Sequence, residues 1–338
     1  MEAENQMSEL NVKPDPRQRA SAPLLRVLDF LTHSSALGGS LILVALLITL
    51  LVVITVSAIP AVREFGFSFF YTSRWSPNKD IFGAWPVIYC TLVTSFIALL
   101  IAVPVSIGSA IFLTKLAPRV RIRFLPARHL VSICSFLIEL LAAIPSIAYG
   151  LWGIAILVPF MQNTVQPFLA HTLGNLPFIG SLFAHPASGF NILTASIVLA
   201  IMVTPITTAI IRDVLAVSPP ELEQGALGLG ATWWQSMKLI LGFSKMGIFG
   251  AVILGLARAM GETMAVTMII GNARPTTNSL FAQGQTIASL LANQFGNADT
   301  PELHALLYTV LILLLITMFI NTTARAILLK ATAPRKRK

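Results

Sequence analysis

Six apolar segments, each long enough to cross a lipid bilayer as a helix, constrain this chain more than any other feature. The hydrocarbon core is about 30 Å thick, and around 20 mostly apolar helical residues cross it. The segments cover about residues 36–59, 87–113, 130–159, 192–211, 247–271 and 304–329. We predict helices rather than strands, because an open sheet edge cannot exist in lipid and barrel strands would be short and alternating. The sequence therefore predicts an all-α integral membrane protein with six transmembrane helices.

The composition agrees with a membrane protein and disfavours a soluble one. Hydrophobic residues make up 55% of the chain and charged residues 11%, whereas a soluble domain has about 25% charged residues. The two cysteines, Cys90 and Cys134, lie in apolar surroundings and form no disulfide framework.

The distribution of Lys and Arg predicts how the chain is oriented. The N-terminal region, the second loop, the fourth loop and the C-terminal region hold four, five, three and six basic residues, whereas the first, third and fifth loops hold three, none and one. Because cytoplasmic loops are enriched in Lys and Arg, we expect both termini in the cytoplasm. The net charge of +9 then comes mostly from the regions expected in the cytoplasm, and no nucleic-acid partner is expected.

This orientation divides the chain into three regions. We expect a cytoplasmic N-terminal tail over residues 1–35, a transmembrane domain over 36–330 with its core in 87–330, and a basic cytoplasmic tail over 331–338. The last tail is expected to contact anionic membrane lipid.

The sequence carries no recognisable catalytic or metal-binding pattern. No pair among its five histidines has the spacing of metal ligands, and neither a P-loop nor a G-x-S-x-G pattern occurs. We therefore predict no catalytic residue and no metal site.

Apart from Arg325 near the end of the last segment, three charged residues fall inside the apolar segments: Glu139, Arg258 and Glu262. Charges at membrane depth usually face the interior of a bundle or a water-filled path. Arg258 and Glu262 are four residues apart, so on one helix they would share a face and could pair. They either form a buried ion pair that fixes packing or line a path for a polar substrate. For Glu139, a structural role and a gating role both remain open.

Two further patterns concern the shape of the spans. Pro145, followed by Ser146, should kink or break the third span, either as a packing kink or beside a cavity that satisfies the freed backbone groups. In the fifth span a stripe of small residues allows another helix to approach closely; it consists of Gly247, Ala251, Gly255 and Ala259.

Within the fourth loop, about residues 218–241 predict a short cytoplasmic helix–turn–helix. Pro219 and Pro220 suit the first turn of a helix that Ser218 could cap, and Glu221 and Glu223 would lie at its positive end. Gly228 and Gly230 would end this helix, and Thr232 could cap the next one. A plain linker is the alternative.

This loop resembles the EAA loop of ABC-importer permeases, whose pattern is E-A-A, three residues, G, nine residues and I-x-L-P. Gln224-Gly225-Ala226 stands at the E-A-A positions, Gly230 at the glycine and Ile240 at the isoleucine. The chain departs from the pattern at Gln224, Gly225, Gly242 and Phe243.

Longer motifs resemble one family, the PstC-type permeases of the bacterial phosphate importer. They are F-G-A-W-P-V-I-Y-C-T-L-V-T-S at 82–95, E-L-L-A-A-I-P-S-I-A-Y-G at 139–150 and L-G-L-A-R-A-M-G-E-T-M-A-V-T-M-I-I-G-N at 254–272. The resemblance covers about residues 65–330. It implies the six-helix fold of type I ABC-importer permeases (MetI-like), with both termini in the cytoplasm of a bacterial inner membrane.

The resemblance also implies partners and roles. The partners are a PstA-type permease, two copies of a PstB-type ATPase that bind ATP and Mg, and a PstS-type periplasmic phosphate-binding protein, so this chain itself carries no cofactor and is not an enzyme. The implied substrate path contains Arg258, Glu262, Thr263, Glu139 and Ser146. The implied ATPase-coupling residues are Glu221, Glu223, Gln224, Gly225, Ala226, Gly228 and Gly230.

The expected function is thus that of a permease subunit of an ATP-driven inorganic phosphate importer. An ion-gradient-driven secondary anion transporter is the alternative, since it would also show broken helices and a few intramembrane charges. A signalling role in phosphate sensing could be added to either.

Overall fold

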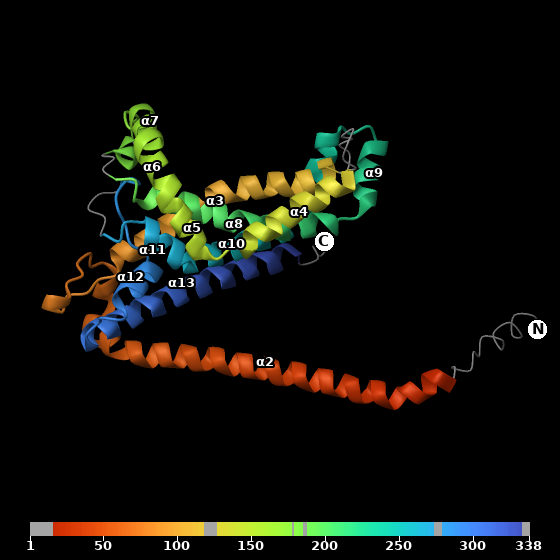
Figure 1. Ribbon diagram of the computed structural model, residues 1–338, viewed down its shortest axis with the longest axis horizontal. Coiled ribbons are helices and arrows are strands. Elements are labelled where there is room, and N and C mark those ends of the chain that lie inside the picture. The colour runs from red at the N-terminus through yellow and green to blue at the C-terminus, as the bar shows by residue number, and fades with distance from the viewer. Residues whose placement is uncertain (1–15, 118–126, 178, 185–187, 274–278, 333–338) are drawn as a thin grey trace, which may run out of the picture. The chain divides into compact units, whose positions relative to one another are not determined.

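The computed structural model describes residues 16–117, 127–177, 179–184, 188–273 and 279–332, which form helices joined by turns (Figure 1). The predicted all-α class is confirmed. The long helices are α2 (Pro16–Phe65), α3 (Trp85–Ile111), α8 (Ile192–Ala216), α10 (Trp233–Gly261) and α13 (Thr300–Thr332). The shorter helices are α4 (Ala127–Ala143), α5 (Ser146–Trp152), α6 (Val158–Phe160), α7 (Gln166–Thr172), α9 (Pro220–Gly228), α11 (Met264–Ile269) and α12 (Ile287–Gln294).

Narrower and wider helical turns join several of these elements. The 3-10 turns are η1 (Gly66–Phe70), η2 (Pro77–Lys79) and η7 (Gly180–Phe183). The π turns are η3 (Phe112–Leu116), η5 (Gly153–Leu157) and η6 (Met161–Val165).

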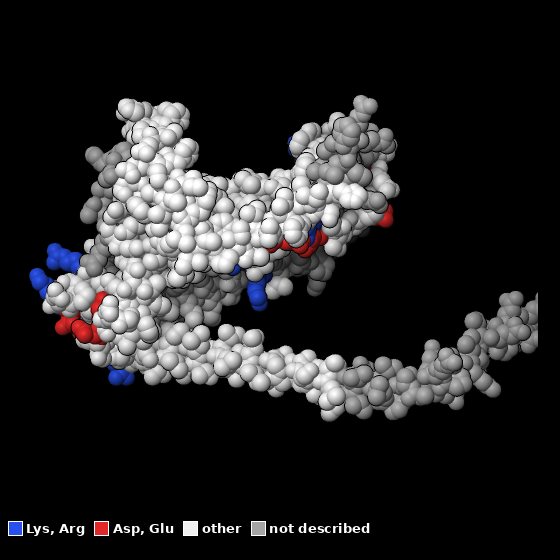
Figure 2. Space-filling model, viewed as in Figure 1, with Lys and Arg blue, Asp and Glu red and all other residues white. Residues whose placement is uncertain are grey.

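Within the described residues, five continuous helices are long and apolar enough to cross a membrane, and a bent pair brings the number to six if it counts as one span. The continuous spans are Phe30–Phe70, Trp85–Leu116, Ile192–Ala216, Trp233–Gly261 and Thr300–Leu329, and the bent pair is Val131–Ala143 with Ser146–Thr172. On the face drawn in Figure 2, large areas of the described helical surface carry no charged side chain. The chain is therefore a multi-pass membrane protein, and the side on which each loop lies stays a prediction.

Several boundaries differ from those expected. Helix α10 begins at Trp233, so Lys238 and Lys245, which we expected in the fourth loop, lie on a helix. Helix α2 begins at Pro16, within the expected tail. The basic residues Arg119, Arg121 and Arg123 and the basic stretch 334–338 lie outside the described residues.

The chain divides into two compact units, residues 1–56 and 57–338. The described side chains of the first unit belong to α2 and are mostly apolar and exposed. In the second unit α3 packs along α8, and α10 packs against both. Small buried residues, among them Ala102, Val203 and Ala259, lie in the core of this second unit.

The small-residue stripe of α10 fits the predicted close approach of a neighbouring helix. A Cβ atom added at Gly255 would lie 2.6 Å from Thr207 Cγ2, and one added at Gly247 would lie 2.5 Å from Val214 Cγ1. Both neighbours belong to α8. The absence of a side chain at these glycines therefore lets α10 lie close to α8.

Candidate functional site

The third span breaks where Pro145 stands, as the sequence predicted. Helix α4 ends at Ala143, α5 begins at Ser146, and the two helical segments are bent by 92°. Pro145 has no N–H to donate to the carbonyl of Leu141, four residues earlier. The hydroxyl of Tyr149 donates to that carbonyl instead, over 2.7 Å. The protein thus satisfies a backbone group that the break frees.

The fifth span also breaks, and this corrects the expected pairing of Arg258 with Glu262. Helix α10 ends at Gly261, Glu262 is extended (φ −68°, ψ 124°), and α11 begins at Met264. The two residues therefore do not share one helical face, and the described residues show no ion pair between them. The expected pairing fails because the backbone leaves the helical conformation at Glu262, directly after Gly261.

The helices that follow the two breaks pack against each other. Helix α5 contacts α11, and a Cβ atom added at Gly150 would lie 2.6 Å from Met268 Sδ. Arg258 is exposed in the last turn of α10, directly before the second break. Both broken spans thus come together near Arg258, while Glu262 and Thr263 are partly buried.

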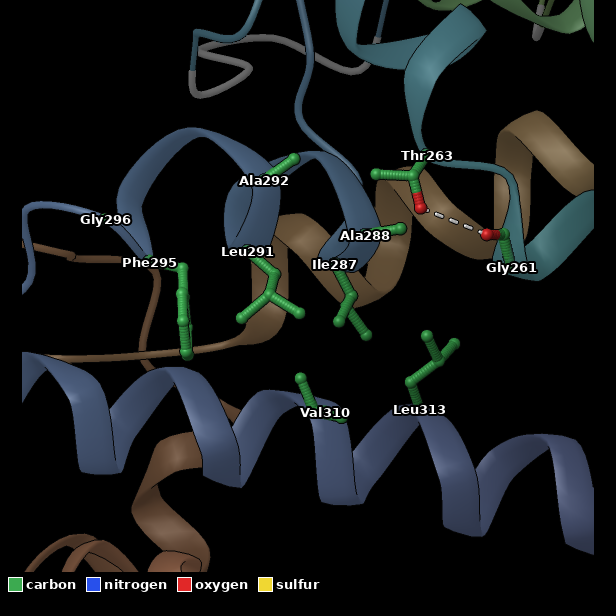
Figure 3. A pocket seen from close by; sticks show the side chains of 10 residues that line it. All are labelled: Gly261, Thr263, Ile287, Ala288, Leu291, Ala292, Phe295, Gly296, Val310 and Leu313. Carbon is green, nitrogen blue, oxygen red and sulfur yellow. Dashed lines mark hydrogen bonds between the residues drawn. The ribbon is translucent and has the colours of Figure 1, made fainter. Parts of the chain in front are cut away.

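A cavity of about 500 Å³ flanks the second break (Figure 3). Gly261 and Thr263 form one wall, and the Thr263 hydroxyl donates to the Gly261 carbonyl over 3.2 Å. The other lining residues belong to α12 and the turn after it and to α13, and include Leu291, Phe295 and Leu313. The lining is mostly apolar, and Thr263 at the break supplies its polar side chain.

Glu139 lies apart from this region. Its Oε1 atom is 3.3 Å from Nη1 of Arg212, near the end of α8, and its side chain is 60% exposed. Arg212 also contacts Asp213. The structure therefore gives Glu139 a partner on α8, and its role in a substrate path stays a prediction, as does that of the partly buried Ser146.

The predicted helix–turn–helix is present. Helix α9 ends at Gly228, and Gly230 adopts φ +83°. The N–H groups of Gly230 and Ala231 donate to the carbonyls of Leu227 and Ala226, which is the Schellman arrangement at a helix C-terminus. Thr232 and Gln235 then form a capping box at the start of α10.

Two details of this loop differ from expectation. Ser218 does not cap α9, because its hydroxyl donates to the Leu215 carbonyl and Pro219 occupies the cap position. Glu223 contacts Lys115 at the end of α3, with 2.8 Å between Nζ and Oε2. The other predicted coupling residues, Glu221, Gln224, Gly225, Gly228 and Gly230, are exposed, and Ala226 is partly buried.

Sequence reasoning missed a segment that enters the bundle before α12. Ile192 and Leu193, at the start of α8, donate their N–H groups to the carbonyls of Ala282 and Leu280. The Ile287 N–H donates to the hydroxyl of Thr91 on α3, and Phe281 is 1% exposed. The signal in the sequence was Thr286 with Ser289, which form a capping box.

Comparison with known proteins places this architecture in a class. Residues 127–338, more than half of the chain, match the model of the binding-protein-dependent transport system inner membrane component. The broken spans, the helix–turn–helix and this match define a membrane component of a binding-protein-dependent transport system, rather than an enzyme.

Individual relatives narrow the class. The chain is 41% identical to the phosphate transport system permease protein PstC of Mesorhizobium japonicum, over 90% of this chain and 91% of the relative. It is 44% identical to PstC of Pasteurella multocida, over 81% and 83%. The chain therefore belongs to the PstC family of phosphate transport permeases. A solved MetNI methionine ABC transporter chain is 17% identical and superposes with a TM-score of 0.48 over 74% of this chain and 94% of that one.

Proposed function

We propose that this chain forms the translocation path of an ATP-driven inorganic phosphate importer together with a homologous PstA-type permease in the bacterial inner membrane. The observation that carries the proposal is the meeting of two broken spans beside Arg258. Helices that break inside an apolar segment leave polar backbone groups that are tolerated where they line a cavity or a path.

The chemistry of the anion fits this place. Arg258 carries a permanent positive charge and a fork of donors that match phosphate oxygens. Glu262 and Thr263 follow at the break, where the backbone is no longer helical. A carboxylate at Glu262 can accept a hydrogen bond from a P–OH group, which sulfate lacks. Arg258 and Glu262 together carry no net charge when no anion is bound. Binding is expected to be weak, since a transport path must release the anion that it admits.

The exposed helix–turn–helix supplies the second half of the proposal. Small residues at Gly225, Ala226 and Gly228 permit close approach of another backbone, and α9 has no buried residue. We propose that two PstB-type ATPase subunits, which bind ATP and Mg, dock on this turn and its counterpart. A PstS-type periplasmic protein would deliver phosphate from the opposite side.

The central test is phosphate uptake into vesicles that contain all four kinds of subunit. We expect uptake to require ATP and to be lost in Arg258→Gln, while the complex still assembles and binds its ATPase. Lys245→Gln is the matched control, because it removes one positive charge from an exposed position of the same helix. Arg258→Lys should keep partial uptake, since the charge remains and the fork is lost. Uptake that follows an ion gradient without ATP would instead indicate a secondary transporter.

Glu262 is tested by competition between anions. An amide can both donate and accept, so Glu262→Gln should lose uptake or admit sulfate as a competitor. If the two charges served only as a structural pair, the swapped variant Arg258→Glu with Glu262→Arg would restore transport. We expect the swap to stay inactive.

A further inference from the structure

Lys115 lies in a wide helical turn at the end of α3. The π turn η3 continues α3 from Phe112 to Leu116. Such turns are rare and often occur at functional sites, because the extra residue changes the direction of the side chains around it. From this turn Lys115 contacts Glu223 on α9, 108 residues away in the sequence.

The contact between Lys115 and Glu223 is shielded from water. Nζ and Oε2 are 2.8 Å apart, and the two side chains are 16% and 13% exposed. The contact between Arg212 and Glu139 is longer, at 3.3 Å, and the carboxylate there is 60% exposed. Shielding strengthens the attraction and makes the loss of one partner more costly. The first pair is therefore the stronger tie between separate helices.

The Lys115–Glu223 pair lies where it can transmit a movement of α9 to the transmembrane helices. Glu223 is partly buried, whereas Glu221 and Gln224 on the same short helix are exposed. Helix α9 thus presents Glu223 to the bundle and its other side to the surroundings. Helix α3, which carries Lys115 at its end, packs along α8 and against α10, and α10 carries Arg258.

We propose that Lys115 is a positioning residue that joins the coupling helix α9 to the transmembrane bundle through Glu223. Displacement of α9 by the ATPase then moves α3 together with the spans packed on it. This inference rests on the proposed function, since it assumes that an ATPase docks on α9.

The test is a charge-reversal cycle in vesicles with the complete transport complex. Lys115→Glu and Glu223→Lys should each lower ATP-driven phosphate uptake at least about fivefold, and the double variant should return to within about twofold of the parent, because neighbours that interact are not additive. Lys245→Glu is the control, since it makes the same charge change at an exposed position of α10 beyond the coupling loop and should transport like the parent.

A second readout separates positioning from simple stability. In each single variant the complex should assemble in normal amount and hydrolyse ATP, but with more ATP consumed per phosphate transported. Normal uptake in both single variants, or a double variant as defective as the product of the singles, would overturn the inference. ATP-independent uptake by the parent would overturn the proposed function as well, so the two failures are distinguishable.

If a single variant does not assemble, the geometry is tested directly. Lys115→Cys with Glu223→Cys, in a chain whose Cys90 and Cys134 are replaced by alanine, should be joined by a short bifunctional thiol reagent in the assembled complex. Replacing Lys245, further along α10, instead of Lys115 in the same pair gives the control. Absence of a cross-link between positions 115 and 223 would contradict the proposed tie.

Discussion

The hydroxyl of Tyr149 donates a hydrogen bond of 2.7 Å to the carbonyl of Leu141, the group that Pro145 leaves without its helical donor. The bond connects the two sides of a 92° bend. One side chain thus stabilises a bend that another residue creates.

Removal of that hydroxyl should weaken the bend. Tyr149→Phe leaves the Leu141 carbonyl with only the longer contact from the Ile144 N–H, at 3.4 Å, and should cost about 1 kcal/mol of stability. Thermal unfolding of the purified complex in detergent measures this. Tyr89→Phe is the control, because the Tyr89 hydroxyl makes no hydrogen bond in the described part of the chain. Equal melting temperatures for the two variants would contradict the prediction.

Replacing either of two glycines on α10 by alanine should change the stability of the protein by different amounts. Gly255→Ala places a Cβ atom 2.6 Å from Thr207 Cγ2, so α8 and α10 must separate, at a cost of about 1–3 kcal/mol. Gly250→Ala meets nothing within 4 Å and should be neutral or stabilising by up to about 1 kcal/mol. Unfolding midpoints of the two variants check this, and a similar loss in both would argue against the close helix contact.

The turn after α9 should not tolerate a β-branched residue at Gly230. Its φ of +83° costs an L-amino acid about 1–2 kcal/mol, so Gly230→Val should distort the turn. We expect ATP-driven phosphate uptake to be lost while the chain reaches the membrane in normal amount. Gly242→Ala, at an open helical position, should transport normally. Normal uptake by Gly230→Val would count against the coupling role of this turn.

The predicted topology can be read by labelling. Ser181 is exposed in η7, within the loop that lacks Lys and Arg, so Ser181→Cys should react with an impermeant thiol reagent added from the periplasmic side. Glu221→Cys, exposed on α9, should react after the membrane is opened. Both variants are made in a chain without Cys90 and Cys134. The reverse pattern would overturn the orientation.

Local sequence chemistry determined which parts of the fold could be predicted. Proline lacks an N–H, so the break at Pro145 was predictable from one residue, as were the glycine turn and the Thr232 cap. The break at Glu262 has no proline to mark it, since residues 254–272 contain none and are mostly apolar, and a single glycine such as Gly261 is tolerated within a helix. A helix over the whole segment was the natural expectation, and the Arg258–Glu262 pair followed from it.

Contacts between distant parts of the chain could not be predicted from one sequence. Lys115 and Glu223 are 108 residues apart, and neither lies in a sequence motif that predicts contact with the other. The segment that supplies the carbonyls of Leu280 and Ala282 to α8 resembles an ordinary loop in composition. The N–H groups at the start of α8 have no partner within their own helix, but which distant segment accepts their hydrogen bonds is decided only in the assembled bundle.

The turn between α9 and α10 is closed by its own residues. Its backbone hydrogen bonds lie within positions 225–231, and the Thr232–Gln235 cap completes it. A segment that already has its bound shape loses little conformational entropy when a partner docks on it. Association with this turn therefore needs no coupled folding step. If the proposed ATPase docks here, the free energy of its contact is available to move the neighbouring helices instead of ordering the turn.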